Sequence, residues 1–522
     1  MNNRPRKFYG WGYADEALSV AEVEIMERRL AERFGVSHWE VTPPPRPEEF
    51  QLPASRIDSV PTRLEPLIST QHLDRLEHSY GQMFVDVARM FERRCPNPPD
   101  AVAKPRRERD VADILDWCSA IGAVAIPYGG GTSMVGGIEP PPRAGKVVTI
   151  DMRGLDVLLE VDTTSCAAHF QAGVVGADIE RSLLEHGLFV RHDMPSFPLS
   201  TLGGWIATRA CGNFTAADPF IDALVESLRA VTPRGILETR RRPAPGPGIS
   251  PDRLLIGSEG TLGIIIDAWI RVARRPKHRK SACLRFPSFN AGADAARAVA
   301  QAELRPAQCQ LLEARDANTH ADADDRTAVL MLGFESIEEP LEAALSRAVQ
   351  VCEASGGRGE ASTSSEEAGN WRTSFLRTPY YTEHLVARGV ATLTLESTIT
   401  WDRFNDFRAN VMEAARHALR DATRRDGHVS CRLDRVHPDG PAASFTVSGV
   451  IDRRAVMEQF GAIQGKVNDA VVANGGTITP YGGVGRAHRA HPADEATLLA
   501  EALRAAKAAL DPKRLLNPGV LV

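Results

Sequence analysis

Hydrophobic and polar positions form two similar blocks in the second half of the chain. In each block, short apolar runs that suit β-strands flank stretches whose apolar residues recur every three or four positions, as in amphipathic helices. The first block predicts strand 281–286, helix 289–303, strand 308–313, strand 328–335 and helix 337–355. The second predicts strand 389–399, helix 401–423, strand 427–435, strand 442–451 and helix 454–474. Two such β-α-β-β-α units suggest one antiparallel sheet backed by helices.

The first half of the chain has a different order of elements. Residues 14–34 carry apolar side chains at helical spacing and predict an N-terminal helix. The proline-rich residues 43–47 predict an extended crossing. Short β-type runs then alternate with helical patterns, which is typical of an α+β domain. The expected elements are helix 108–121, strands 123–126, 146–152 and 167–173, helix 176–187, and strands around 225–237 and 263–273, with a loop at 241–251. A last helix, 494–509, is expected to return to this domain.

Three segments rich in glycine, serine and threonine lie within this domain. The first follows the strand at 123–126 and reads Pro-Tyr-Gly-Gly-Gly-Thr-Ser at 127–133. The others are Ser-Thr-Leu-Gly-Gly-Trp-Ile-Ala-Thr-Arg-Ala at 200–210 and Gly-Ser-Glu-Gly-Thr-Leu-Gly-Ile-Ile at 257–265. Glycine accepts a positive φ and lets backbone N–H groups approach an anion, and hydroxyl groups add donors. One such loop fits a surface turn equally well, but three predict a long phosphate-bearing cofactor held by backbone.

Two common nucleotide-binding signatures are missing from the sequence. No G-x-G-x-x-G segment lies between a strand and a helix with an acidic residue ~20 positions further on. The pattern G-x-x-x-x-G-K-[ST] is also absent. The sequence therefore indicates neither a Rossmann dinucleotide site nor a P-loop, which narrows the choice of ligand.

The three loops resemble the FAD domain of the vanillyl-alcohol-oxidase type flavoproteins. Within that superfamily the chain is most similar to the alkyldihydroxyacetonephosphate synthases, the flavoenzymes of ether-lipid synthesis, and the resemblance covers nearly the whole chain. It rests on the loops and on further motifs at 7–13 (Lys-Phe-Tyr-Gly-Trp-Gly-Tyr), 192–211, 231–235 (Val-Thr-Pro-Arg-Gly), 371–380, 395–403 (Leu-Glu-Ser-Thr followed by Trp-Asp-Arg) and 510–519.

The resemblance implies an α+β fold with a two-subdomain FAD-binding domain of the PCMH/VAO type and a cap domain, an antiparallel sheet with helices on one face. It places an N-terminal helical and extended segment at 1–98, the FAD domain at 99–276, the cap at 277–474 and a C-terminal segment returning to the FAD domain at 475–522. The flavin loops carry no His or Cys where covalent members attach FAD, so non-covalent FAD is expected. The residues expected to hold it are Pro127, Tyr128, Gly129, Gly130, Gly131, Thr132, Ser133, Pro195, Ser196, Phe197, Pro198, Leu199, Ser200, Thr201, Gly203, Gly204, Thr208, Arg209, Ala210, Cys211, Glu259, Gly260, Thr261, Leu262, Gly263, Ile264 and Ile265.

The same resemblance suggests where the chemistry takes place. In the family the flavin N5 nitrogen acts as a nucleophile that displaces a fatty acid from acyl-dihydroxyacetone phosphate, and a fatty alcohol then replaces the flavin. His192 stands where the synthases have a functional histidine. At three further places the chain departs from the family. The triple-histidine run is here Thr479-Pro480-Tyr481, an essential tyrosine is replaced by His437, and an arginine is replaced by Gln310.

These departures suggest substitute residues for catalysis and substrate binding. His437 would shuttle protons with a pKa nearer neutrality than that of tyrosine, and Tyr481 would compensate for a lost histidine. The phosphate of the substrate needs a cation, for which Arg372, Arg377 and Arg432 are candidates because a guanidinium holds a phosphate through two hydrogen bonds. Each of these residues also has an ordinary interpretation as a surface charge or a packed aromatic.

Two other functions stay open. An FAD-dependent oxidoreductase acting on a hydroxy acid or alcohol would often bind a divalent metal through two histidines and an acid. His428 lies at the corresponding place, but the other expected ligands are missing, so no metal is expected. A flavoprotein that has lost catalysis and serves as a binding subunit would explain the three replaced positions.

The composition limits the partners that this protein can bind and the cellular compartment in which we expect it. The chain has 522 residues, 43% of them hydrophobic, so it can bury more than one core. Its net charge of -5 argues against a nucleic-acid binder, and its eight cysteines without a C-x-x-C pair fit free thiols in a reducing cytoplasm. The N-terminus lacks the apolar core of a signal peptide, and no run approaches ~20 apolar residues. We expect a cytoplasmic homodimer that acts on a small-molecule or lipid substrate; contact with a membrane surface stays open, because a lipid substrate would require it.

Overall fold

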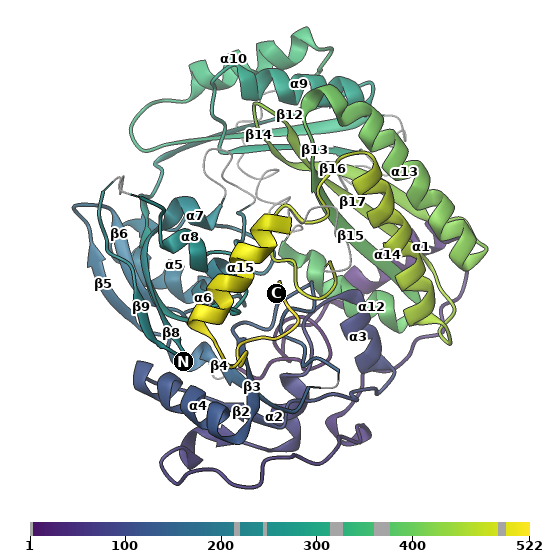
Figure 1. The fold of residues 1–522 in the computed structure, drawn as a ribbon. Helices are drawn as coiled ribbons and strands as arrows, with labels where there is room; N and C mark the ends of the chain where they lie inside the picture. Colours follow the sequence, from purple (N-terminus) through teal and green to yellow (C-terminus); the bar gives the residue numbers. More distant parts are fainter. Residues whose placement is uncertain are drawn as a thin grey trace.

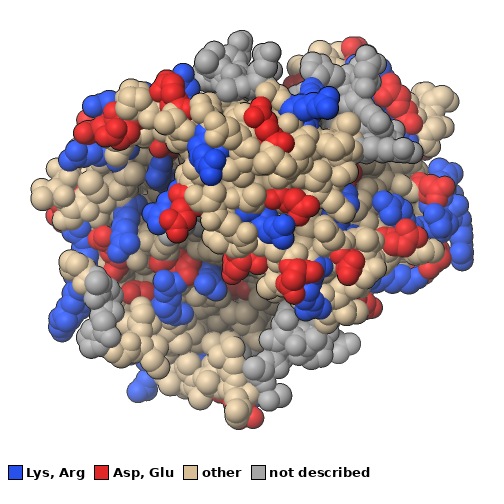
Figure 2. Space-filling view, turned by 90° about the horizontal axis from the view of Figure 1, so that it is seen from above, with Lys and Arg blue, Asp and Glu red and all other residues tan. Residues whose placement is uncertain are grey.

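The computed structural model describes residues 4–142, 144–212, 220–243, 248–313, 327–359, 376–488 and 497–521. In this part of the chain, three larger sheets and one strand pair are arranged around a central region to which the C-terminal helix returns (Figure 1). None of the described helices is long and apolar enough to cross a membrane. Figure 2 shows acidic and basic side chains intermixed over the face seen from above.

The first sheet carries the strand that leads into the first glycine-rich loop. Its order is β1 (Ile68–Ser69), β2 (Ala101–Ala103), β4 (Lys146–Asp151) and β3 (Ala123–Tyr128), with β2, β4 and β3 parallel. Helix α4 (Glu108–Ile121) packs its apolar face on this sheet, with Ile114 and Cys118 fully buried. A left-handed Gly122 (φ 66°) ends the helix, as is common where a helix turns into a strand.

The second sheet is antiparallel throughout. Its order is β5 (Leu158–Asp162), β6 (Ala167–Gln171), β10 (Ile264–Arg271), β8 (Val225–Thr232) and β9 (Gly235–Glu238). Helices α5 (Gly176–Leu184) and α6 (Leu202–Ala207) share its hydrophobic core, in which Phe170 and Trp205 are the largest fully buried side chains. The strand pair β7 (Leu188–Phe189) and β11 (Ala273–Arg274) closes this part of the chain before the third sheet begins.

The third sheet has six antiparallel strands and confirms the single sheet expected from the two repeated units. Its order is β12 (His278–Phe286), β14 (Ala328–Ser336), β13 (Gln308–Glu313), β16 (His428–Val436), β17 (Pro441–Val450) and β15 (Val390–Thr398). The two units meet between β13 and β16, where Leu311 lies opposite Leu433. Helices α9 (Phe289–Gln301), α10 (Glu342–Ala354), α13 (Trp401–Thr423) and α14 (Val456–Ala473) share one large core with the sheet and leave its other face to the rest of the molecule (Figure 1).

Shorter elements connect the sheets. The helices not yet mentioned are α1 (Val20–Phe34), α2 (His72–Glu77), α3 (Phe84–Phe91), α7 (Ile221–Leu224), α8 (Asp252–Leu255), α12 (Tyr381–Ala387) and α15 (Thr497–Leu510). Single 3₁₀ turns lie at η1 (Pro47–Glu49), η2 (Glu65–Leu67), η3 (Met152–Gly154) and η4 (Thr378–Tyr380). Helix α15 packs Leu503 and Leu510 against the core of the second sheet, and the buried Lys507 donates to the carbonyl of Thr261 at 2.6 Å.

Some boundaries and elements differ from the sequence-based expectation. Helix α1 begins at Val20 rather than at residue 14, because Ser19 and Glu22 form a capping box there. Helix α10 begins at Glu342 rather than at residue 337, because Pro340 keeps the residue before it out of helical geometry. Helix α3 was not predicted. Its polar residues, Asp86 and Arg89, lie three positions apart, as on one face of a helix, but its eight residues are fewer than the roughly 11 over which such spacing identifies a helix.

Candidate active site

The three glycine-rich segments meet at one place. A Cβ on Gly129, in the first segment, would lie 2.3 Å from the hydroxyl oxygen of Thr201 in the second. Gly260, in the third, has a φ of +72°, and a Cβ there would lie 2.2 Å from Cγ of Pro127. Only glycine permits this backbone approach. The segments that the sequence assigned to one cofactor therefore lie in contact with one another.

The first segment keeps its backbone donors available. In the described part of the chain, the N–H groups of residues 130–133 donate to no protein acceptor. The segment is held through its acceptors instead: the Ser133 hydroxyl accepts the N–H of Gly137 at 3.3 Å, and the Ser133 carbonyl accepts that of Gln82 at 2.7 Å. Backbone donors at a protein surface that lack a protein partner are ready to bind an anion.

The second segment is held rigid by a pair of stacked aromatic rings, Phe197 and Trp205, which we call the aromatic wall. Thr201 caps α6 by accepting the N–H of Gly204, and the indole N–H of Trp205 donates to the hydroxyl of Ser200 at 2.7 Å. The Phe197 ring stacks on Trp205 with a centroid separation of 5.5 Å. Because Trp205 is only 1% exposed and its polar atom is satisfied, this wall has little freedom to move.

Glu259 joins the third segment to the C-terminal part of the chain. Its carboxyl group accepts the N–H groups of Val484 at 2.6 Å and Gly485 at 2.9 Å. The side-chain amide of Asn517 donates to the carbonyls of Gly137 and Glu259, at 2.9 and 2.8 Å. Burial raises the pKa of Glu259 to about 7, although the two N–H groups oppose this shift.

The raised pKa makes the stability of the ligand-free protein depend on pH. Because the folded state binds the Glu259 proton more tightly than the unfolded chain, this contribution is complete below the ordinary pKa of 4.5 and is lost as the pH rises through about 7. We expect wild type to lose about 2 kcal/mol more unfolding free energy than Glu259→Gln between about pH 5 and about pH 8. Urea unfolding at both pH values measures this, and an equal loss in the two proteins would contradict it.

His192 is completely buried beside the aromatic wall. Its ring centroid lies 5.1 Å from that of Trp205, and neither ring nitrogen has a hydrogen-bond partner among the described residues. Burial, with a smaller effect from the charge of Arg435, lowers the pKa of His192 to about 3, so the ring is neutral at physiological pH. A neutral imidazole has one donor and one acceptor, and leaving both unsatisfied costs free energy that a bound ligand would restore.

Arg435 is a second buried group at this site, and the hydrophobic pattern gave no sign of it. It lies near the end of β16, where a bulge between Leu433 and Arg435 shifts the register against β17. In a regular strand, residues 433 and 435 would point to the same, helix-covered face. The extra residue at position 434 turns Arg435 to the opposite face, which it shares with Arg432.

The Arg435 side chain reaches from the third sheet to the second glycine-rich segment. It donates to the carbonyl of Gly212 at 2.9 Å and to that of Cys211 at 3.2 Å. Its guanidinium lies 3.9 Å from the ring centroid of Tyr481, a cation–π contact. Arg435 therefore links the cap sheet, the second segment and the C-terminal segment at one point.

Tyr481 and Glu396 complete this cluster, which we call the His192 group (His192, Arg435, Tyr481 and Glu396). Burial raises the pKa of Tyr481 well above its ordinary value, against the opposing effect of Arg435, so the phenol keeps its proton. Burial also raises the pKa of Glu396, on β15. The group thus combines a guanidinium with a neutral imidazole and a neutral phenol.

Three other residues singled out in the sequence lie on the cap sheet. Arg432 is paired with Asp434 at 2.9 Å. Gln310 is buried on β13 and accepts a hydrogen bond from Gln308 at 2.9 Å. His437 lies in the turn after β16, and burial lowers its pKa. They stay predictions as substrate-binding or catalytic residues.

The structure places one of the two remaining arginines, Arg377, and its partners lie outside the His192 group. Arg377 forms an ion pair with Glu22 of α1 at 3.0 Å and lies over the ring of Tyr380, so the structure shows it joining the N-terminal helix to η4. Arg372 lies outside the described residues. Among the predicted cofactor residues, Leu262, Ile264 and Ile265 are buried in the protein core, and the two isoleucines pair with β8.

Family models match both halves of the chain. Residues 99–240 match "FAD binding domain", and residues 275–521 match "FAD linked oxidases, C-terminal domain". An alkyldihydroxyacetonephosphate synthase from Trypanosoma brucei brucei is 26% identical over 481 residues, which cover 86% of this chain and 77% of the relative. One from Caenorhabditis elegans is 25% identical over 579 residues, covering 99% and 95%.

The chain belongs to the alkyldihydroxyacetonephosphate synthase family. A solved alkyldihydroxyacetonephosphate synthase shares the fold, with a TM-score of 0.83, 21% identity and 98% of each chain covered. The synthase family lies within the vanillyl-alcohol-oxidase type flavoproteins, so this chain is an FAD-dependent enzyme. The site fits that cofactor, because residues 130–133 offer a row of unpaired N–H donors where a diphosphate requires them.

Proposed function

We propose that this enzyme exchanges the acyl chain of acyl-dihydroxyacetone phosphate for the alkyl chain of a fatty alcohol, with FAD bound non-covalently. The observation that carries this proposal is the His192 group: a buried imidazole without a partner next to a guanidinium that touches the second flavin segment. The relatives named as synthases cover most of the chain and support the same choice. Although three family positions are replaced in this chain, the site still contains a cation, Arg435, and two groups that can transfer protons, His192 and Tyr481.

The three segments would hold FAD along its length. The N–H groups of residues 130–133 would bind the diphosphate, and the second segment, held in place by the buried Trp205 behind it, would face the ring system. Bound FAD would supply the nucleophilic N5 nitrogen for the exchange. The cap, residues 277–474, would cover the substrate.

Arg435 and Arg432 would bind the substrate phosphate. The bulge places both on the same face of β16, and a guanidinium suits a phosphate because it donates two parallel hydrogen bonds. His192 would accept a proton from the ketose carbon, and Tyr481 would donate one back. A phosphate bound near His192 would add negative charge that raises its pKa, so the ring would become a better base when substrate binds.

The lipid substrates of this reaction lead us to propose contact with a membrane surface. We also propose a homodimer, as for the family.

The mode of FAD binding has a direct test. We expect purified enzyme to be yellow, and acid precipitation to release all flavin into the supernatant, because no side chain of the three segments attaches it. Absorbance of the two fractions measures the outcome. Flavin that stays in the washed pellet would show a covalent bond and would contradict non-covalent binding.

The reaction is tested by anaerobic incubation with acyl-dihydroxyacetone phosphate and hexadecanol. We expect one fatty acid released for each ether product, and an oxidised flavin spectrum at the end. Bleaching by a 2-hydroxy acid without exchange would instead establish an oxidoreductase. No response to either substrate class would favour a binding subunit.

A further inference from the structure

The N-terminal motif at 7–13 belongs to a closed loop that packs on the flavin segments. The N–H of Ala14 donates to the carbonyl of Pro5 at 2.8 Å, and Arg6 and Tyr13 form a β-bridge. Trp11 and Tyr13 are buried against Leu199. We call residues 5–14 the N-terminal clasp.

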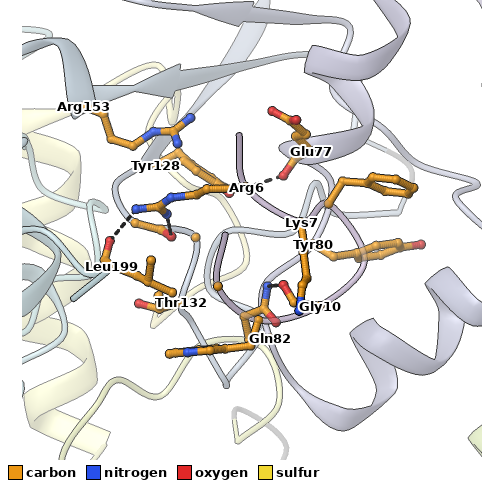
Figure 3. A pocket seen from close by; sticks show the side chains of 15 residues that line it. Arg6, Lys7, Gly10, Glu77, Tyr80, Gln82, Tyr128, Thr132, Arg153 and Leu199 are labelled. Atoms are coloured by element: carbon orange, nitrogen blue, oxygen red, sulfur yellow. Dashed lines mark hydrogen bonds between the residues drawn. The ribbon is translucent and has the colours of Figure 1, made fainter. Parts of the chain in front are cut away.

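Arg6 of the clasp contacts two flavin segments at once. Its guanidinium donates to the carbonyl of Gly130 in the first segment and to that of Leu199, just before the second, the latter at 2.9 Å (Figure 3). These carbonyls lie close together, because a Cβ on Gly130 would be only 2.2 Å from the Leu199 oxygen. Two converging carbonyl oxygens repel each other, and a planar guanidinium with several fixed donors bridges them well.

The contact with Gly130 also orients the next donor of the loop. In a planar trans peptide, the C=O of one residue and the N–H of the next point in opposite directions. Since Arg6 holds the Gly130 carbonyl, the N–H of Gly131 points away from Arg6. That N–H has no protein acceptor among the described residues, and Gly131 adopts a φ of +68° with a Cβ position only 2.1 Å from the Tyr128 hydroxyl.

We propose that Arg6 is a positioning residue for the cofactor: it holds the Gly130 and Leu199 carbonyls from behind, so that the Gly131 N–H faces the FAD diphosphate. The peptide between Gly130 and Gly131 has no side chain on either flanking residue, so its orientation depends more on external contacts such as those of Arg6. Holding it in the binding orientation before FAD arrives removes an ordering cost from the binding step. This inference rests on FAD occupying the three segments.

The clasp is anchored on its other side to the cap part of the chain. Lys7 forms a buried ion pair with Glu383 of α12 at 2.8 Å, with side-chain exposures of 4% and 9%. Gly12, with a φ of +87°, lies against the Tyr380 ring. Helix α12 leads directly into β15, which carries Glu396. The anchor keeps Arg6 in place against the flavin segments.

The proposal is tested by measuring FAD and riboflavin binding to the apoprotein. Riboflavin lacks both phosphates, so it reports on the ring site alone. We expect Arg6→Met to weaken FAD binding by about 10- to 100-fold while riboflavin binding stays within about twofold of wild type, since one or two charge-assisted hydrogen bonds are lost. Arg6→Lys should fall in between, because an ammonium group on a flexible stem does not bridge the two carbonyls as a planar guanidinium does.

Arg4→Met is the matched control. Arg4 lies two residues away, 37% exposed and paired with Asp15 and Glu16, and its loss should leave both affinities unchanged. Arg6→Met that binds FAD like wild type, or loses FAD and riboflavin affinity equally, would overturn the proposal. If Arg6→Met fails to fold, Arg6→Lys is used instead, and the same comparison between lost FAD affinity and lost riboflavin affinity decides. Wild type that binds FAD but performs no exchange would refute the proposed function and leave this inference intact.

Discussion

Arg435→Met is expected to lower kcat/KM for acyl-dihydroxyacetone phosphate by roughly 100- to 1000-fold. The substitution removes the buried guanidinium that faces the second flavin segment, and removing one partner of a buried charge pair costs about 2–5 kcal/mol. It also removes the contacts to the carbonyls of Cys211 and Gly212 and the cation next to Tyr481. Steady-state kinetics at varied concentrations of acyl-dihydroxyacetone phosphate measures this loss of kcat/KM. The loss should be much smaller when the substrate is an analogue that lacks the phosphate.

Two variants control for this prediction. Arg435→Lys keeps the charge but replaces the planar donor set, so it should recover only part of the activity. Arg408→Met removes another cap arginine, which is 19% exposed and paired with Glu313. It should leave kcat/KM within about threefold of wild type. If Arg435→Met and Arg408→Met behave alike, the phosphate is bound elsewhere.

His192→Phe should lower kcat by roughly 100- to 10,000-fold, the range typical of a lost general base. A phenyl ring has the planar shape of the imidazole and is only slightly larger, so it can occupy the same place against Trp205 and FAD affinity should change little. Both quantities are measured on one preparation, kcat by product formation and affinity by FAD titration of the apoprotein. A variant that keeps wild-type kcat would remove His192 from the reaction.

The pH profile of the wild type gives a second test of this residue. His192 accepts a proton only while neutral, and its pKa in the free enzyme is lowered to about 3. After correction for the second ionisation of the substrate phosphate, which lies at about pH 6, kcat/KM should therefore stay level as the pH falls from neutral to about 5. An acid limb centred near the ordinary histidine value of 6.5 would contradict the burial of this ring.

The fold could be predicted from the sequence where side-chain periodicity decides the structure. The six strands and four long helices of the cap follow from short apolar runs and helical spacing: the central strands β16 and β17 are buried almost throughout, and each long helix has one buried face. The three glycine-rich segments could be assigned to one ligand because their composition permits close backbone approach. Helix α3 was missed because its eight residues are fewer than the roughly 11 over which helical spacing is recognised.

The site was harder to predict because its members depend on tertiary geometry. Arg435 points into the site only because of a one-residue bulge, which has no signature in the hydrophobic pattern. Arg377 lies in a motif shared with the family, yet its partner is Glu22, more than three hundred residues away in sequence. The presence of a polar residue in a family motif therefore does not show whether it binds substrate or stabilises the fold, because that depends on which residue it contacts in the folded chain.

Incubation with acyl-dihydroxyacetone phosphate and ¹⁸O-labelled hexadecanol tests the exchange most directly. In the proposed reaction the bond between the ketose carbon and the acyl oxygen breaks, the fatty acid leaves with both of its oxygens, and the alcohol oxygen bonds to that carbon as it loses its proton. Mass spectrometry should find ¹⁸O in the ether product and none in the released fatty acid. An ether product without the label, or bleached flavin with no ether product, would contradict the account.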